Sequence, residues 1–418
     1  MKRILFMGLL MCCPVLFYAQ SAFRQLNGGN ETDQGNSIIA TSDGGFCIIG
    51  STNSFGNGSD DVYVIKMTKN YEQKWAKVFD LGNKEYGFSA IETSDGGIAI
   101  AGQTFYSFTT DSAWDAFVLK LDSKGNPLWS KSLGGAKKDA ANAITELSDG
   151  DILVAGSTTS YGQGLNDIYL VKLSSTGFVL WTRTMGTVSD DIAYSVTKTK
   201  NGGFAFAGAS NGFRPFVAKC DAGGATMWSK NIGFSNTSIG AFNAIIETKG
   251  CGLALAGYTK NAQSNYDVMV TKLDKNGEMQ WTRLVGNKGD DKGNSIIEDN
   301  NKNLMIAGYV NYARTGYLQN LYSIKLNSNG NLIWTKAITE GSESVGRSLI
   351  KWRDSSYIVT GSAWENHGGS LYKADVYLAK FGPSGFICGT PASEDNSEFI
   401  SPVITTPIYM NSLGGEAA

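Results

Sequence analysis

The chain has 418 residues and a formal net charge of -2, with 36 basic side chains set against 38 acidic ones. Because it carries no basic excess to neutralise a phosphate backbone or to hold an anionic membrane surface, we expect no nucleic-acid partner. Its 51 glycines, 20 phenylalanines, 18 tyrosines and 9 tryptophans accompany short runs of alternating β-branched and aromatic residues, which predicts an all-β protein.

Residues 1–20 are predicted to be a secretory signal peptide. Lys2 and Arg3 precede an apolar run over residues 4–17, and a cleavage position follows near Ala19. We therefore expect the rest of the protein to be exported, to the periplasm, the cell surface or the medium. No later stretch reaches the ~18 uninterrupted apolar residues of a membrane helix, so no transmembrane span is expected.

The cysteines leave two alternatives open. Those inside the signal suit a lipoprotein poorly, because Cys12 follows Met11 instead of the small residue that precedes an acylated cysteine. The four cysteines outside the signal peptide are expected to reach an oxidising compartment, where they permit three disulfide pairings. Free thiols buried inside strands are the alternative, since a large domain needs no covalent staples. The four are Cys47, Cys220, Cys251 and Cys388.

Three columns of residues recur along the chain. Each unit has an apolar strand that ends at a glycine, a second that ends at a lysine and a third that is centred on a tryptophan. A repeat of about 50 residues with four short strands and no helix predicts a β-propeller, and the number of units predicts seven four-stranded blades. The columns are Gly50, Gly102, Gly156, Gly208, Gly257, Gly308 and Gly361; Lys66, Lys120, Lys172, Lys219, Lys272, Lys325 and Lys380; and Trp75, Trp129, Trp181, Trp228, Trp281 and Trp334.

The first unit shows the expected elements, with strands over residues 37–39, 46–50 and 62–66 and a fourth around Trp75. Pairs such as Asp43-Gly44 join the first two strands, because Asp and Gly reach the positive φ values of a tight hairpin. Later units join the third and fourth strands by an Asp-rich type I turn that ends in glycine. These turns lack the alternating oxygen ligands of a calcium loop, so no metal site is predicted there.

The two chain ends predict how the ring closes. After the seventh lysine strand, Val376 to Lys380, no tryptophan strand follows. Residues 22–29 instead match residues 128–135, an alignment that places Phe23 in the tryptophan column. We therefore expect the N-terminal strand to form the outer strand of the last blade, which removes an exposed sheet edge.

The predicted organisation is a signal peptide over residues 1–20, a seven-bladed β-propeller over residues 21–389 and a C-terminal tail over residues 390–418. The tail is too short for another immunoglobulin-like domain of about 100 residues. A flexible extension, a docking peptide and a strand folded onto the ring all remain open for it.

The repeat resembles that of the bacterial secreted seven-bladed β-propeller repeat proteins. Their units read Gly-Gly, an acidic residue, Asp-Gly-Gly, Ala-Gly-Ser-Thr, Asp-x-Tyr-x-x-Lys, Gly and Trp, and the resemblance covers residues 21–389. It implies the fold and an exported module without a defined activity. Unit five departs from the pattern, with Ile239 in the acidic column and Cys251 at the usual turn glycine, so we expect that blade to be the least regular.

The sequence assigns no catalytic residue, metal site or cofactor. The sole histidine, His367, lies in a predicted loop, which excludes a multi-histidine metal site and leaves no recognisable nucleophile-base pair. A column of carboxylates just before the first strand of five units is a candidate for cation binding or acid-base work. Its repetition once per blade favours residues that hydrogen-bond backbone amides at the blade junctions. The column is Asp33, Glu85, Asp139, Asp191 and Asp291.

Aromatic residues outside the three columns are the candidate binding residues. They fall in the longer loops between the second and third strands, at one rim of a rigid scaffold, where binding residues are commonly found. The alternative is that they only cover the bases of those loops. They are Trp114, Tyr161, Tyr312, Tyr317, Trp364 and Tyr372.

We favour a non-enzymatic binding or scaffold module that engages a protein or glycan of the cell envelope through this loop-rich face. One alternative is a subunit of an outer-membrane or secretion assembly of a Gram-negative bacterium. Another is a polysaccharide hydrolase or lyase that uses the carboxylate column.

Overall fold

The computed structural model describes residues 24–56, 59–81, 84–108, 111–233, 239–311, 319–338, 343–366, 372–385 and 403–405. The predicted signal peptide, Phe23, Tyr312, Tyr317 and His367 lie outside these ranges. Among the described residues, no helix has the length and apolar character needed to cross a membrane.

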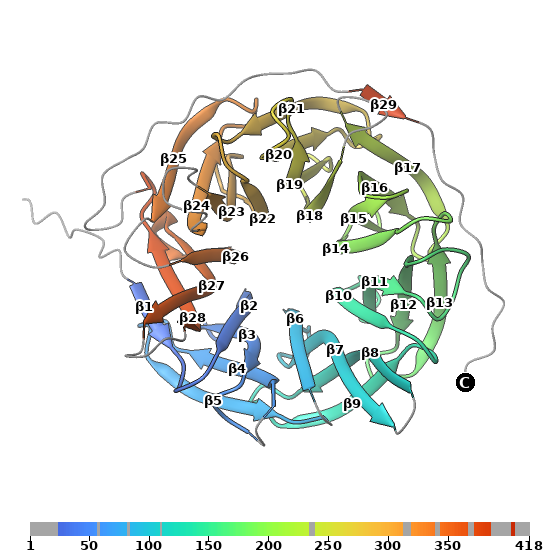
Figure 1. The fold of residues 1–418 in the computed structure, drawn as a ribbon, viewed down its shortest axis with the longest axis vertical. Helices are drawn as coiled ribbons and strands as arrows, with labels where there is room; N and C mark the ends of the chain where they lie inside the picture. The colour runs from blue at the N-terminus through green and yellow to red at the C-terminus, as the bar shows by residue number, and fades with distance from the viewer. Residues whose placement is uncertain are drawn as a thin grey trace, which may run out of the picture.

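The chain is a seven-bladed β-propeller of antiparallel sheets (Figure 1). We call the strands of a blade a, b, c and d from the axis outward. Blades 1 to 3 are β2 (Asp33–Ala40), β3 (Phe46–Thr52), β4 (Asp61–Met67) and β5 (Gln73–Phe79); β6 (Lys84–Glu92), β7 (Ile98–Phe108), β8 (Asp111–Leu121) and β9 (Pro127–Leu133); and β10 (Asp139–Glu146), β11 (Ile152–Thr158), β12 (Asp167–Leu173) and β13 (Val179–Met185).

The second half of the ring continues the same order, and a short 3-10 helix, η1 (Arg353–Ser355), lies in the a–b turn of blade 7. Blades 4 to 7 are β14 (Ile192–Lys198), β15 (Phe204–Ser210), β16 (Arg214–Cys220) and β17 (Thr226–Gly233); β18 (Gly240–Glu247), β19 (Leu253–Lys260), β20 (Tyr266–Leu273) and β21 (Met279–Val285); β22 (Lys292–Glu298), β23 (Leu304–Asn311), β24 (Gln319–Leu326) and β25 (Leu332–Ile338); and β26 (Ser344–Lys351), β27 (Tyr357–Asn366), β28 (Tyr372–Phe381) and β1 (Arg24–Asn27).

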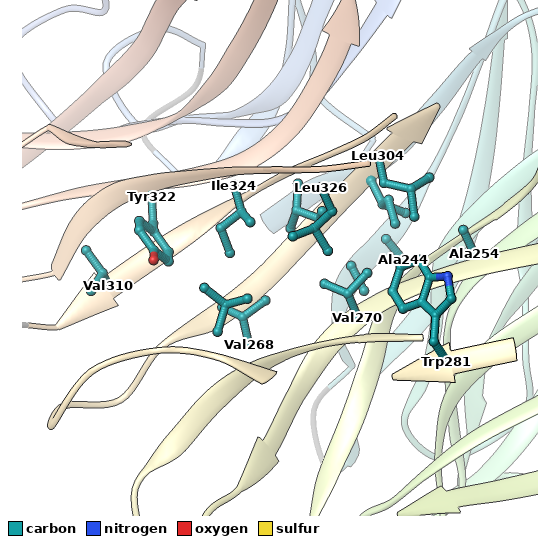
Figure 2. Close-up of a cluster of buried hydrophobic side chains, with 14 of the residues drawn as sticks. Ala244, Ala254, Val268, Val270, Trp281, Leu304, Val310, Tyr322, Ile324 and Leu326 are labelled. Atoms are coloured by element: carbon teal, nitrogen blue, oxygen red, sulfur yellow. The ribbon is translucent and has the colours of Figure 1, made fainter. Parts of the chain in front are cut away.

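The blades pack face to face through their b and c strands. β3, β4, β11, β12 and β15 are buried along their whole length, so they read in the sequence as nearly continuous apolar runs. Figure 2 shows one of the resulting clusters, in which Ala254, Val268 and Val270 of blade 5 meet Ile324 and Leu326 of blade 6. Equivalent clusters fill the other junctions, so the core of the protein lies between blades.

A tryptophan on strand d packs against a glycine in the c–d turn of the next blade. Gly277 has a φ of 81°, and a β-carbon there would lie 2.7 Å from the Trp228 ring. Glycine meets both demands because it has no side chain. The pairs are Trp75–Gly125, Trp129–Gly177, Trp181–Gly224, Trp228–Gly277, Trp281–Gly330 and Trp334–Gly385.

A cation two residues after the tryptophan reaches the same turn. Lys230 Nζ donates to the carbonyl of Gly277 at 2.7 Å and lies 5.8 Å from the centre of the Trp228 ring. Arg283 Nε donates to the carbonyl of Gly330 at 2.8 Å. These two junctions therefore combine aromatic packing with a charged hydrogen bond to the turn, and at Trp228 also a cation–π contact.

The lysine column ties the end of strand c to the a–b turn of the same blade. Lys120 is buried, and its Nζ lies 2.9 Å from a carboxylate oxygen of Asp95 in that turn. Burial raises the pKa of Asp95, but hydrogen bonds from Thr93, the amide of Gly97 and Lys120 lower it overall to about 2. The carboxylate is therefore ionised at neutral pH and pairs with the lysine. The same contact recurs as Lys66–Asp43, Lys172–Asp149 and Lys325–Asp299.

Strand β1 occupies the outermost position of the blade that also contains β26, β27 and β28 (Figure 1). It pairs antiparallel with β28, from Arg24 opposite Ala379 to Asn27 opposite Val376. The two ends of the propeller thus share one sheet. A further contact follows β1, where Lys373 Nζ lies 2.7 Å from a carboxylate oxygen of Glu31.

Blade 4 has its four predicted strands and a fifth strand added at its outer edge. β29 (Val403–Thr405), from the predicted tail, pairs antiparallel with the outer strand β17, with Ile404 opposite Ile232. Strand d leaves one edge of each blade unpaired, and a short segment with β-branched residues satisfies that edge. The repeat columns contain no signal for this pairing because the tail lies outside them.

In blade 5 the acidic column lies one residue later than predicted. Gly240 pairs with Thr259 as Asp33 pairs with Thr52, so Gly240 occupies the acidic column and the assignment of Ile239 to it is wrong. The a–b turn of blade 5 does depart from the pattern, since Cys251 takes a φ of 61° where most blades use glycine.

Three cysteines are free thiols in the described part of the chain, namely buried Cys47, buried Cys220 and exposed Cys251. Burial raises the pKa of Cys47 and of Cys220 to about 12. These two therefore behave as small apolar side chains within their strands. Cys388 lies outside the described residues.

Removal of residues 21–30 is expected to destabilise the protein more than removal of residues 395–418. The first deletion takes away a whole blade strand, at about 0.5–1.5 kcal/mol for each lost hydrogen bond, and leaves β28 as an open edge. Among the described residues, the second removes only the extra strand β29. Thermal melting of both truncations checks this, and equal melting temperatures would contradict it.

The substitution Gly277→Ala is expected to cost more stability than the matched Gly202→Ala. Both glycines have positive φ, 81° and 89°, so both changes carry about 1–2 kcal/mol of backbone strain. A methyl group at Gly202 meets nothing within 4 Å, whereas at Gly277 it meets Trp228, which adds about 1–3 kcal/mol of overpacking. Urea unfolding measures the difference, and equal losses would show that the tryptophan contact is loose.

Candidate functional site

The b–c and d–a connections of all blades lie on one face of the ring, which we call the loop face. This follows from the antiparallel order, because strands b and d both end where strands c and a begin. The opposite face carries only the a–b and c–d turns, most of them tight. Variation between blades is therefore concentrated on the loop face.

In the part of the chain that the structure describes, two blades have lengthened b–c hairpins on the loop face. β7 and β8 of blade 2 have 11 residues each and stay paired as far as Phe108 opposite Asp111. β27 and β28 of blade 7 have 10 residues each and stay paired as far as Asn366 opposite Tyr372. The equivalent strands of blades 1 and 3 have 7 residues. The two long hairpins lie on the two neighbours of blade 1.

Trp114 lies on the long hairpin of blade 2 within an aromatic cluster. Its ring centre is 5.0 Å from that of Phe105 and 5.6 Å from that of Tyr86. The Tyr86 hydroxyl donates to a carboxylate oxygen of Asp60 in blade 1 at 2.7 Å. The predicted binding residue is thus half-buried and linked through Tyr86 to the neighbouring blade.

Tyr161 has a counterpart in blade 1, so it does not break the repeat. Its ring lies against Gly135 as the ring of Phe55 lies against Gly29. The Tyr161 hydroxyl also donates to the carbonyl of Gly134 at 2.8 Å. These contacts are those of an aromatic residue that covers a loop base.

Two of the remaining predicted aromatics, Trp364 and Tyr372, lie on the long hairpin of blade 7. Trp364 lies on the long hairpin of blade 7 opposite Ala374, with its backbone amide donating to the carbonyl of Glu343 at 2.8 Å. Tyr372 begins β28. Tyr312 and Tyr317 lie outside the described residues.

A cleft of about 510 Å³ lies where β1 meets blade 1. Phe55 and Tyr63 form an aromatic side of the cleft, with ring centres 5.7 Å apart, and Gly28 and Val78 line it further. Phe55 is 43% exposed. No pattern in the repeat indicates this cleft, because part of its lining, Asn27 and Gly28, precedes the first strand of blade 1.

The five carboxylates of the acidic column are all fully buried. Each accepts a hydrogen bond from the backbone amide four residues earlier, so the column holds the d–a connection in place. The pairs are Gly29–Asp33 at 2.7 Å, Gly135–Asp139 at 2.9 Å, Thr187–Asp191 at 2.6 Å, Asn287–Asp291 at 2.6 Å, and Leu81–Glu85.

The same carboxylates also reach strand b or the loop that follows it. Asp191 accepts a hydrogen bond from the amide of Asn211 at 2.8 Å, and Asp33 accepts one from the hydroxyl of Ser54 at 2.7 Å. Each carboxylate therefore joins two connections of the loop face. These contacts fit a framework role for the column better than an open catalytic one.

Comparison with known proteins supports the fold and leaves the activity open. No family model matches the chain. The regulatory protein FlaEY of Caulobacter vibrioides is 26% identical over 157 residues, which are 32% of this chain and 16% of that protein. The chain thus spans well under two thirds of this relative.

The chain also resembles solved structures at low sequence identity. A protein of unknown function from Dyadobacter fermentans has a TM-score of 0.51 at 11% identity, over 85% of this chain and 97% of that one. Sqt1 from Chaetomium thermophilum has a TM-score of 0.48 at 10% identity, over 87% and 100%. An α-L-arabinofuranosidase from Fusarium graminearum has a TM-score of 0.48 at 11% identity, over 86% and 97%. The likeness to the Dyadobacter fermentans protein, at 11% identity, shows the fold alone.

Asp191→Asn is expected to lower the free energy of unfolding by about 1–3 kcal/mol. The asparagine retains one acceptor oxygen but turns an amide N–H group toward one of the two backbone donors that Asp191 now accepts. Asp122→Asn, in an exposed c–d turn, is the matched control and is expected to cost less. Denaturant unfolding of both variants checks this, and an unchanged D191N would argue against a framework role.

Proposed function

We propose that the chain is an exported, non-enzymatic binding module that holds a protein or a glycan of the cell envelope on its loop face, over blades 7, 1 and 2. The observation that carries the proposal is the pair of lengthened hairpins, β7–β8 and β27–β28, on either side of blade 1. In a repeat protein, a feature that is absent from the other blades is not needed to build a blade. Such a feature is therefore a candidate for a specific function.

Aromatic side chains supply the contact surface of this proposed site. Trp114 and Trp364 lie on the two hairpins. Phe55 covers a loop base as Tyr161 does, but it also lines the cleft where β1 meets blade 1. Half-exposed tryptophan and phenylalanine rings offer a large, rigid area both to protein side chains and to sugar rings. The proposal therefore assigns the first contact with the ligand to these three residues.

The hydrolase alternative has less support. A carboxylate catalyst must reach its substrate, whereas the column carboxylates are buried and engaged with backbone amides. Their recurrence at five blades is accounted for by the loop connections that they hold. The assembly alternative uses the same loop face and differs only in the permanence of the partner.

The test compares wild type with the triple variant Phe55→Ala, Trp114→Ala and Trp364→Ala in glycan arrays and in pull-downs from Gram-negative envelope extracts. The control variant, Phe178→Ala with Leu180→Ala, removes exposed apolar side chains from β13 and its c–d turn, far from the proposed site. We expect the triple variant to bind at least about tenfold more weakly and the control to bind normally.

Equal binding by wild type and the triple variant would overturn the proposed site. Release of product from a polysaccharide panel by the wild-type protein would favour the hydrolase instead. A stoichiometric membrane partner that remains bound through purification would identify the permanent assembly.

A further inference from the structure

Carboxylates occur in pairs at five of the blade junctions. The column residue at the start of strand a faces an aspartate of strand c in the preceding blade. At two junctions a β-carbon added to one glycine would approach both members, and at the other three the members are close enough to interact electrostatically. The pairs are Asp375–Asp33, Asp61–Glu85, Asp115–Asp139, Asp167–Asp191 and Asp267–Asp291.

A glycine five residues before the column carboxylate makes room for four of these pairs. A β-carbon on Gly28 would lie 2.1 Å from Asp375 Oδ1 and 2.7 Å from Asp33 Oδ2. A β-carbon on Gly186 would lie 1.9 Å from Asp167 Oδ1. The glycines are Gly28, Gly134, Gly186 and Gly286.

The junction between blades 1 and 2 differs at two positions at once. Asp80 stands at the glycine position, and the column residue is Glu85, which is one methylene longer than aspartate. Oxygen atoms of Asp61, Asp80 and Glu85 lie within 4.8 Å of one another. We call these three residues the acid cluster.

Glu85 provides the second observation. Its side chain is fully buried, and Oε1 accepts the hydroxyl of Thr104 at 3.0 Å. Oε2 is also buried, and among the described residues it has no hydrogen-bond partner. An ionised carboxylate in this position needs a compensating positive charge.

We propose that Asp61, Asp80 and Glu85 bind a divalent cation of the calcium type at the junction of blades 1 and 2. The donor set consists of carboxylate oxygens, which hard cations prefer. With ligands at about 2.3–2.6 Å, two oxygens on opposite sides of a calcium ion lie about 5 Å apart, and the cluster fits within that span.

An entry path exists on the side of Asp80. This residue is exposed and lines a second cleft, of about 370 Å³, between strand d of blade 1 and strand d of blade 2. Water from this cleft completes the coordination of an ion that takes 6–8 oxygen ligands. Because Asp61 belongs to blade 1 and Glu85 to blade 2, the ion also bridges two blades.

The inference stands independently of the proposed binding function. It concerns an ion between blades, and it holds whether or not the loop face binds a glycan or a protein. Variants of Trp114 and Phe55 are accordingly expected to retain the ion, so failure of either proposal is recognised separately.

The experiment titrates calcium chloride, and separately magnesium chloride, into the chelator-treated protein while heat release and thermal melting are measured. Asp80→Gly is the main variant, because it restores the residue that four other junctions carry and is expected to fold. Asp115→Asn is the matched control, since the Asp115–Asp139 pair also contains buried oxygens without a described partner but has Gly134 instead of a third carboxylate.

For the wild type we expect one bound calcium ion per chain, a higher melting temperature in calcium and weaker binding of magnesium. For D80G we expect calcium binding at least about tenfold weaker, with melting in chelator close to wild type. D115N is expected to bind as wild type does. No binding by the wild type at millimolar calcium, unchanged binding by D80G, or loss of binding by D115N would each overturn the proposal.

Discussion

The contact between a strand-d tryptophan and the turn glycine of the next blade is the constraint on which the ring depends. It joins the outside of one blade to the c–d turn of its neighbour, and it requires a positive φ and a missing side chain at the same residue. Since six junctions repeat it, the angle between successive blades is set locally. At the closing junction Tyr71 takes the turn position with a φ of 68°, so the last contact is built from different residues.

The lysine and carboxylate columns stabilise other parts of the same ring. Buried lysines join strand c to the a–b turn, and buried carboxylates join the d–a connection to the b–c loop. Both columns recur because every blade faces the same need to satisfy its backbone groups and hold its connections. What recurs is therefore explained by the fold. The two functions that we propose both lie where the pattern changes, in the two long hairpins and at Asp80.

Much of the frame can be predicted from the sequence, because the same residue pattern recurs in each blade. Glycine spacing indicated seven blades, and the Asp-Gly pairs located the turns. Pairing of the tail was not readable, since β29 meets β17 with Ile404 opposite Ile232 and the tail lies outside the repeat. The cleft at Phe55 was not readable either, because no column of the repeat marks its lining. The shift from Ile239 to Gly240 shows that column assignments err by one residue where a connection is irregular.

The acid cluster could not be predicted from the sequence either. Glu85 was already in the candidate column, but Asp61 begins a strand in another blade and Asp80 looks like an ordinary residue after a strand. Only the alignment of the five d–a connections reveals that Asp80 replaces a glycine, and only the ring brings it to Asp61 and Glu85. A residue that fills a space kept empty at four equivalent junctions adds a negative charge where two carboxylates already face each other. Such a change is costly unless a cation shares the site, and that is the physical reason to regard this junction as different from the rest.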